Sequence, residues 1–574
     1  MSSRASSAIS SPPLRKNGLI LVFALIALWV AMITAVNPVG NFPLNDDWAY
    51  GKSVLRLLET GRFEVPAWSA MNHITQIYWG ALFCLPFGFS LTALRFSTLI
   101  MGLIGVLATY GLLREADADP GISFLGSLLV LINPIYLGLS NTFMSDVPFL
   151  SLAVLSTWLF VRSLRRGSPL ALAGGLFFAC AALLLRQSGL AIFIGFGAAL
   201  IWHKGFKPIN IFKALIPLVM GAGLQIFFQF WLKSTGRISP FFGNPSNDIL
   251  KIFQADWRAV IVEYAKIALE TAIYSGMFLF PFVAIIGLRT ITALPSRRRR
   301  WPLLWILGFS TITMAAFIRW NVWMPFTNNV MSEIGLGPLL LRDATFGPTN
   351  FPTPLAVKFL WMAMTIISVF GAACFFYFIF LAVRRVFIRR LKIESRIKSL
   401  TTLSLVVMVV YFVAMVTRGF FDRYLLPIWP FFLLLMSVTG AKKGEAKADA
   451  RTIVALGLIL LLLFGGFALG ATHDYLLWNR VRWGALSELM KDSHVTAKQI
   501  DGGLEFNGWN LFSLTYIPLP GKSWWWVEGD DYVLAFAPMT GYDVLKRHRL
   551  KRWLPFGPEN ILVLRRREGA PAKQ

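Results

Sequence analysis

The chain has 574 residues, of which 56% are hydrophobic and only 15% are charged, and its mean hydropathy is +0.61. A soluble globular protein carries about 25% charged residues, so this composition excludes an ordinary soluble enzyme and indicates many membrane spans. The net charge of +26 does not indicate a nucleic-acid partner, because the basic residues gather in short loops between apolar runs.

The apolar runs predict a mainly α-helical, polytopic membrane protein with about thirteen transmembrane helices, since about 20 apolar residues cross a bilayer. The first run lacks a small-residue cleavage site and is expected to be an uncleaved anchor. Residues 1–18, which precede this run, are expected to form a disordered cytoplasmic tail. A short surface or re-entrant helix is expected to open the second run. The expected spans are 19–36, 76–113, 121–140, 146–162, 169–185, 188–203, 209–231, 266–288, 301–318, 355–383, 400–417, 424–439 and 451–470.

Basic residues in the short loops orient these spans. With the N-terminus in the cytoplasm, strongly basic loops such as Arg297–Arg300 and Arg384–Lys398 all fall on the cytoplasmic side. The loop 37–75 and the chain after Leu469 then lie on the extracytoplasmic side. We expect the protein in a bacterial inner or plasma membrane, in contact with membrane lipids and with no nucleic acid.

Past the last span, the apolar pattern gives way to short elements separated by Gly and Pro. The expected elements are a helix over 478–490 and strands over 532–537 and 560–565. We therefore expect a membrane module over 19–470 and a small extracytoplasmic α+β domain over 471–574. The run Trp524–Trp526 is interpreted as core or membrane interface more readily than as a sugar-stacking platform.

Two neighbouring carboxylates, Asp46 and Asp47, follow the first span on the extracytoplasmic side. Adjacent carboxylates repel each other, which raises the pKa of at least one of them unless a cation or donor compensates. Such a pair suits general-base catalysis or a divalent cation. The alternative is a solvated loop or a helix N-cap, for which Asp is also favoured.

Other polar side chains are expected on the same side of the membrane. Arg186 interrupts an apolar stretch, so it needs a partner, either an anionic substrate headgroup or one of the carboxylates. Asp146 could simply cap a helix, and Asp422 with Arg423 could form a surface pair. Together, these groups could hold a lipid phosphate while a carboxylate takes a proton from a hydroxyl. The candidate substrate-binding residues are His73, Gln76, Asp146, Arg186, Arg423 and Tyr424.

Three short motifs resemble those of the polyprenyl-phosphate-sugar-dependent GT-C glycosyltransferases, the group of the protein O-mannosyltransferases and the aminoarabinose transferase of lipid A. The motifs are Asp46–Asp47, Ser145–Pro148 and Arg423–Pro427, and the layout of spans and loops from 19 to 440 is similar too. One stretch, Asn72–Tyr78, departs from the group because it lacks the two prolines that are common there. The resemblance implies a GT-C fold with a glycosyltransferase (hexosyl- or pentosyltransferase) activity.

The resemblance also implies the reaction and the roles of the residues. An inverting enzyme would move a sugar from undecaprenyl or dolichyl phosphate to a hydroxyl of a glycan, lipid or protein acceptor. Asp46, slightly preferred, or Asp47 would deprotonate the hydroxyl. Arg186 and Arg423 would stabilise the departing phosphate. No cofactor is required, although a divalent cation could be held by the two neighbouring carboxylates.

Two other functions fit the same composition. A flippase or transporter of lipid-linked sugars would also carry charges among its spans. Against it, no internal repeat of the span pattern is visible, and the polar groups favour one membrane face over the midplane. A structural or assembly subunit that binds a partner through its C-terminal domain is the third possibility.

Overall fold

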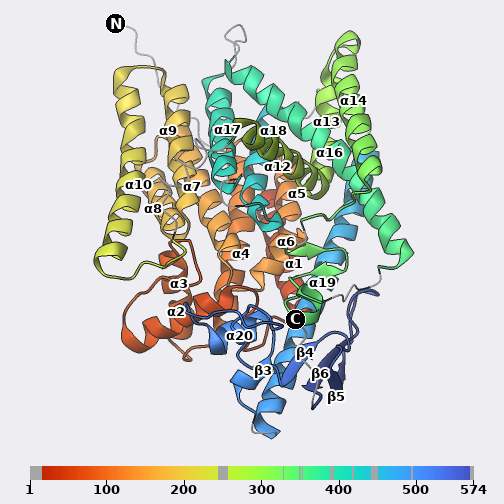
Figure 1. Cartoon of the computed structure of the whole chain (residues 1–574). Helices are drawn as coiled ribbons and strands as arrows, with labels where there is room; N and C mark the ends of the chain where they lie inside the picture. Colours follow the sequence, from red (N-terminus) through yellow and green to blue (C-terminus); the bar gives the residue numbers. More distant parts are fainter. Residues whose placement is uncertain are drawn as a thin grey trace, which may run out of the picture.

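Long apolar helices make up most of the computed structural model and stand together as one bundle, with the C-terminal domain at one end (Figure 1). The structure describes residues 16–242, 256–327, 329–347, 351, 353–387, 394–416, 419–440, 450–492 and 495–568. Most of the expected tail, residues 1–15, lies outside this described part. The helices of the bundle are α1 (Lys16–Val36), α4 (Leu91–Glu115), α5 (Pro120–Leu131), α6 (Pro134–Ser140), α7 (Asp146–Arg166), α8 (Pro169–Leu185), α9 (Leu190–Lys204), α10 (Pro208–Ser234), α12 (Trp257–Phe278), α13 (Phe280–Ala293), α14 (Ser296–Trp320), α16 (Leu355–Phe387), α17 (Ser395–Val416), α18 (Ile428–Thr439) and α19 (Ala450–Asp492).

The expected mainly α-helical, polytopic architecture is confirmed. Within the described residues, seven helices are long and apolar enough to cross a membrane, or up to nine if the bent pairs α5–α6 and α12–α13 each form one span. The remaining spans that the sequence predicts fall on α8, α9, α18 and the first part of α19. Three of these are short, with 17, 15 and 12 residues for α8, α9 and α18.

Two of the expected spans are bent where a proline opens a new helix. α5 and α6 meet at 60°, and Pro134 is the first residue of α6. Asn133 caps the new helix by accepting hydrogen bonds from two backbone N–H groups at 3.0 and 3.1 Å. α12 and α13 meet at 92° next to Pro281. Proline has no N–H with which to continue a helical ladder, so an apolar run that is uniform in hydropathy is divided there.

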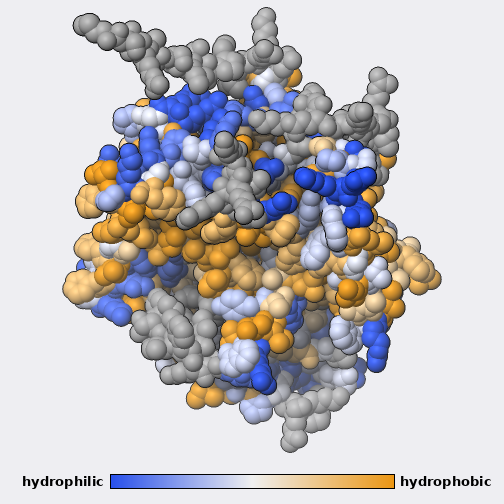
Figure 2. Space-filling model, turned by 90° about the horizontal axis from the view of Figure 1, so that it is seen from above, coloured by the Kyte–Doolittle hydropathy of each residue, from blue (hydrophilic) through white to orange (hydrophobic). Residues whose placement is uncertain are grey.

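The outward faces of the peripheral helices are apolar. On α10, Ile226, Phe227 and Phe230 are 67%, 66% and 67% exposed, as expected of side chains that face lipid rather than water. Seen from above, the end of the bundle away from the C-terminal domain shows hydrophilic patches among hydrophobic side chains (Figure 2). This end of the bundle therefore exposes polar side chains, unlike the outward face of α10.

Several short elements lie at the other end of the bundle, next to the C-terminal domain. The two helices that follow α1 both lie there (Figure 1). Their sequence is only partly apolar, and they are not among the described helices that could span a membrane. The short elements are α2 (Asp47–Thr60), α3 (Ile74–Cys84), η1 (Gln187–Gly189), β1 (Met331–Ser332), β2 (Gly335–Leu336), α15 (Arg342–Thr345) and η2 (Asp422–Leu425).

The C-terminal domain is a small α+β unit, as the sequence predicts. Its sheet has the strand order β3-β4-β6-β5, in which β6 pairs antiparallel with both neighbours and β3 lies parallel to β4. Leu534, Ile561 and Val563 pack with Leu486 of α19 in a shared core. The elements are η3 (Ala497–Gln499), β3 (Ile500–Asp501), α20 (Leu504–Leu511), β4 (Tyr532–Ala535), β5 (Tyr542–Arg549) and β6 (Asn560–Arg566).

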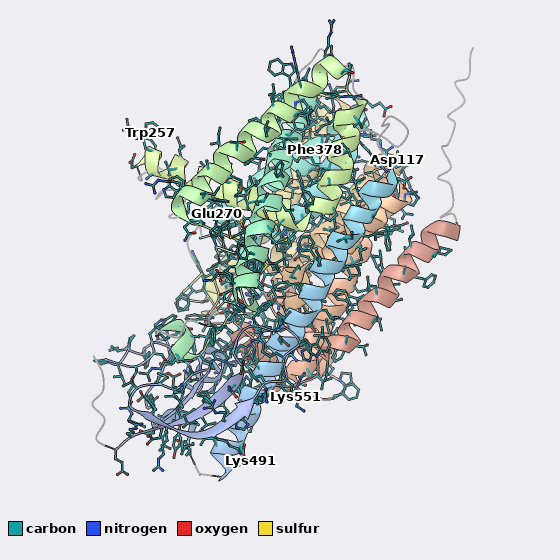
Figure 3. The ribbon with its side chains drawn as sticks, turned by 90° about the vertical axis from the view of Figure 1, so that its right-hand side faces the viewer. Asp117, Trp257, Glu270, Phe378, Lys491 and Lys551 are labelled. Atoms are coloured by element: carbon teal, nitrogen blue, oxygen red, sulfur yellow. The ribbon has the colours of Figure 1, made fainter. Side chains whose placement is uncertain are left out.

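Helix α19 joins the bundle to this domain without a break. It has 43 residues, and Figure 3 shows it as one rod that leaves the bundle and ends near Lys491. The expected division between residues 470 and 471 therefore lies within a continuous helix. The fall in hydropathy therefore does not mark the end of a helix, because α19 continues into the C-terminal domain.

Candidate functional site

Asp46 presents its carboxylate to an arginine and a tryptophan. It is the residue before α2, yet among the described residues its side chain makes no capping hydrogen bond. Oδ1 accepts a hydrogen bond from Trp68 Nε1 at 3.0 Å, and Oδ2 lies 3.5 Å from Arg423 Nη2. The side chain is 18% exposed, so the carboxylate is held on both sides and still reaches solvent. The helix-cap alternative is therefore not what the geometry shows.

Asp47 faces away from Asp46. Its carboxylate accepts hydrogen bonds from the backbone N–H of Leu44 and, at 3.0 Å, from that of Phe143. The side chain is buried, and desolvation raises its pKa from 3.8 to about 7. The contacts of Asp47 tie the loop before α2 to the segment that precedes α7. The two neighbouring carboxylates thus do not share one site.

Arg186 has the carboxylate partner that its position in an apolar stretch requires. Helix α8 ends at Leu185, and the next residue, Arg186, has an extended backbone (φ −141°, ψ 134°). Arg186 Nη2 lies 2.8 Å from Asp146 Oδ1, and Nε and Nη2 donate to Ser145 Oγ at 3.0 and 2.7 Å. Both members of the ion pair are buried, with 5% and 0% of their side chains exposed.

Arg423 is fixed by its backbone and leaves two donor atoms unused. The neighbouring Asp422 accepts from the N–H groups of Arg423, Val330 and Met331 at 2.7 to 3.1 Å. Asp422 therefore holds backbone, and it is buried rather than at the surface; desolvation raises its pKa to about 6. Within the described part of the chain, Nε and Nη1 of Arg423 are buried and have no hydrogen-bond partner. Buried donors of this kind suit a bound anionic ligand.

His73 lies behind the cluster as a neutral side chain. It is fully buried, its ring packs on that of Tyr50 at 4.3 Å between centroids, and Nδ1 lies 3.2 Å from Gln76 Oε1. Desolvation lowers the pKa of His73 to about 3, so the imidazole offers no positive charge to a phosphate near pH 7. Gln76 in turn donates to the carbonyl of Phe143, and Tyr424 packs beside the guanidinium of Arg423.

The expected groups converge around Tyr50, a residue that the sequence analysis did not single out. Burial raises the pKa of Tyr50 well above its ordinary value, and the charges that act on it are those of Asp46, Arg423, Arg186 and Asp146. The structure therefore brings these four side chains together, whereas Asp47 and Gln76 are engaged elsewhere. Tyr50 follows Asp46 by four residues across the start of a helix, which is a usable signal of a shared face.

Trp68 is the second residue that the sequence analysis missed. It donates to Asp46 and lies among the rings of Trp48, Phe512 and Trp526, with centroids 5.1 to 6.2 Å apart. Two of these rings come from the C-terminal domain, more than 400 residues away along the chain. No local pattern could have indicated that contact. Of the tryptophan run, Trp525 and Trp526 are buried, in agreement with the core interpretation.

A small apolar hollow of about 10 Å³, room for about one water molecule, adjoins the cluster inside the bundle. Tyr411, which lines it, interacts electrostatically with Arg186, so the hollow begins beside the buried ion pair. Its walls come from α7, α9, α17 and α18 together with η1. They are formed by Phe149, Ala153, Ser188, Ala191, Ile192, Val407, Met408, Tyr411, Pro427, Ile428 and Phe431.

The described residues contain no group of three or more His, Cys, Asp or Glu side chains that could hold a metal ion. A cation bound jointly by Asp46 and Asp47 would require Asp47 to give up its contacts with Leu44 and Phe143. Asp46 alone faces the cluster. A divalent cation shared by the two neighbouring carboxylates therefore does not fit their present geometry.

A family model described as dolichyl-phosphate-mannose-protein mannosyltransferase matches residues 76–231. The match confirms the resemblance. The chain is thus similar to GT-C glycosyltransferases, which use lipid-linked sugar donors. The matched segment includes Gln76, Asp146 and Arg186, whereas Asp46 and Arg423 lie outside it.

Distant structural similarity is found to three solved glycosyltransferases. The S. cerevisiae protein O-mannosyltransferase Pmt1–Pmt2 complex bound to the sugar donor has 14% identity and a TM-score of 0.32, over 38% of this chain and 34% of that chain. The Archaeoglobus fulgidus oligosaccharyltransferase has 14% identity and a TM-score of 0.40, over 84% of this chain and 58% of that one. ArnT from Cupriavidus metallidurans bound to undecaprenyl phosphate has 12% identity and a TM-score of 0.37, over 96% and 98%. This chain therefore spans about a third of the length of the first structure and just over half of the length of the second. A search of curated proteins finds no match.

Proposed function

We propose that the protein is an inverting glycosyltransferase that moves a sugar from a polyprenyl-phosphate donor to a hydroxyl acceptor. The reaction would take place at the extracytoplasmic face of a bacterial inner or plasma membrane. The observation that carries the proposal is the pair Asp46–Arg423. A solvent-accessible carboxylate lies 3.5 Å from a guanidinium that has two buried, unused donors.

In the proposed reaction, Asp46 is the general base. It takes the proton of the acceptor hydroxyl while the hydroxyl oxygen bonds to the anomeric carbon. The bond between that carbon and the phosphate oxygen breaks, and the phosphate leaves with the electron pair. Attack from the side opposite the phosphate inverts the anomeric carbon. Phosphate is a good leaving group, so the proposed step requires no cofactor.

The arginines would receive the phosphate. Nε and Nη1 of Arg423 can donate to its oxygens, and these charge-assisted hydrogen bonds strengthen as negative charge develops on the leaving group. Arg186 adds positive charge from its fixed place beside Asp146. The acceptor is then a glycan, a lipid or a protein hydroxyl that approaches Asp46 from the exposed side.

The proposal is tested by sugar transfer from a labelled polyprenyl-phosphate sugar in liposomes. Asp46→Asn should lower the transfer rate by about 10²–10⁴-fold, the usual cost of losing a general base. The matched control is Asp256→Asn, because Asp256 caps α12 at an exposed position and Asn caps equally well. Full activity in Asp46→Asn would refute the assigned chemistry. Translocation of the lipid-linked sugar without transfer, by wild type, would show a flippase instead.

A further inference from the structure

The first extracytoplasmic loop is in direct contact with α20 of the C-terminal domain. The backbone N–H of Asn45 donates to Glu505 Oε1 at 3.0 Å, across 460 residues of sequence. Asn45 is the neighbour of the proposed base, Asp46. Its φ of 55° lies in the left-handed region, which is uncommon for residues other than glycine and needs surrounding contacts to maintain it.

Glu505 is itself held by a second buried group. Its Oε2 lies 3.0 Å from Arg482 Nη2, and the side chains of both residues are completely buried. Arg482 belongs to α19, the helix that leaves the bundle, so the carboxylate bridges that helix and the loop. Each oxygen of Glu505 therefore has a partner in the described structure. A buried ion pair in a low-dielectric site keeps its geometry because any movement leaves a charge unpaired.

The surface around this hydrogen bond is closely packed. Trp48, the second residue of α2, lies so near Gly508 of α20 that a Cβ at position 508 would come within 2.5 Å of the Trp48 ring. Lys52 Nζ donates to the carbonyl of Gly508 at 3.1 Å. The ring of Trp48 also packs on Phe512 and Trp526, with centroids 5.1 and 5.4 Å apart. Helix α20 and the residues that follow it therefore pack closely against the start of α2.

We infer that Glu505 is a positioning residue, which fixes the Asn45 backbone so that the Asp46 carboxylate faces Arg423. This role rests on the proposed function of Asp46. It makes the C-terminal domain part of the machinery that orients the base. A shift of about 1 Å in a catalytic group can lower a rate by about 10²-fold, so a contact one residue away is sufficient to matter.

The experiment compares two double variants of the full-length protein, both in an Arg482→Met background, so that neither leaves a buried arginine unpaired. Glu505→Gln keeps an oxygen that can accept from the Asn45 N–H, and Glu505→Met removes it with little change in volume. With Glu505→Gln, the transfer rate should stay close to that of the wild type. With Glu505→Met, kcat should fall by about 10²-fold at unchanged KM for the donor. Equal kcat in the two double variants would overturn the inference.

Hydrogen exchange supplies a readout that does not depend on the chemistry. The peptide that contains Leu44–Asp47 should exchange faster with Glu505→Met than with Glu505→Gln. Asp530→Asn is the matched control, because the buried Asp530 of the same domain forms ion pairs with Arg342 and Arg566 and, among the described residues, none with the loop. It should lower thermal stability without faster exchange of the loop peptide. Unchanged exchange with Glu505→Met would also overturn the inference.

Asp46→Asn, measured in the same assay, separates the two proposals. If Asp46→Asn is inactive while both double variants transfer sugar equally, only the role of Glu505 is refuted. If Asp46→Asn is fully active, the proposed base is refuted and the positioning role with it. Slow transfer with Glu505→Met and rapid transfer with Glu505→Gln, together with an inactive Asp46→Asn, support both.

Discussion

At the scale of single residues, Asp46 and Asp47 show how two identical neighbours acquire different roles. Asp47 lies inside the protein, where its carboxylate accepts hydrogen bonds from two backbone N–H groups. Asp46 lies one position earlier, on the exposed side of the same turn, and faces Arg423. The sequence analysis could only prefer Asp46 slightly, since nothing local distinguishes the two. The distinction arises from burial, which depends on the packing of α2 against the segment before α7.

Burial of Asp47 predicts a pH dependence of stability. Its pKa is about 7 in the folded protein and 3.8 as a free side chain, so between those values the folded state keeps a proton that the unfolded chain releases. The stabilisation is complete below pH 3.8 and is lost as the pH rises through 7. Thermal unfolding of wild type and Asp47→Asn from acidic to neutral pH measures this term. The Tm of wild type minus that of the variant should fall as the pH rises. A difference that stays constant would contradict the burial argument.

The candidate site was predictable in its charges and less so in its contacts. An arginine in an apolar run needs a partner, and the sequence offered either an anionic headgroup or a carboxylate for Arg186. In the structure the partner is the carboxylate of Asp146. The expected surface pair of Asp422 and Arg423 is absent from the described structure, because Asp422 binds backbone N–H groups instead. Trp68 could not have been found, since hydrogen bonds between distant segments leave no periodic or local pattern.

At the scale of elements, α19 does two jobs that the sequence analysis assigned to separate domains. Its first part belongs to the bundle, and its last part carries Arg482 to Glu505. The strands β4 and β6 and the helix over 478–490 were correctly expected from alternation and periodicity. The continuity of α19 was not expected, because hydropathy falls in the same way whether a helix ends or only leaves the membrane. The bends at Pro134 and Pro281 were likewise hidden within uniform apolar runs.

The continuity of α19 predicts the effect of lengthening it. One alanine inserted between Leu476 and Leu477 should rotate everything beyond it by about 100° and move it by about 1.5 Å. Arg482 and α20 would then no longer fit the first loop, so sugar transfer should be lost although the protein still inserts into the membrane. One alanine inserted after the exposed Leu514 is the control and should be tolerated. Transfer by the α19 insertion at the wild-type rate would show that the helix is no rigid connection.

At the scale of the whole molecule, the bundle has two different ends. Arg297–Arg300 lie at the start of α14, at the end of the bundle away from the C-terminal domain (Figure 1). The candidate site and the C-terminal domain lie at the other end. Composition and hydropathy predicted this polytopic class and the order of its spans. They could not predict how α2, α3 and α20 close around the site, because these helices are only partly apolar and are placed by tertiary packing.

The two ends predict which residues a membrane-impermeant reagent reaches. In a variant without Cys84, Cys180 and Cys374, single cysteines are introduced at Lys491, at Lys551 or at Arg298. Figure 3 shows Lys491 and Lys551 at the end of the molecule with the C-terminal domain. We expect a charged maleimide to label these two positions in intact spheroplasts and to label position 298 only after permeabilisation. The reverse pattern would place the candidate site in the cytoplasm.

The central claim, that Arg423 holds the phosphate of a prenyl lipid in front of Asp46, is tested most directly by mass spectrometry of the lipids that co-purify with the protein. Wild type should carry a prenyl phosphate, with or without a sugar. Arg423→Met should lose it, whereas Arg56→Met, which removes an exposed arginine of α2, should keep it. Bulk phospholipids alone in wild type, or equal amounts of prenyl phosphate in wild type and Arg423→Met, would contradict the account.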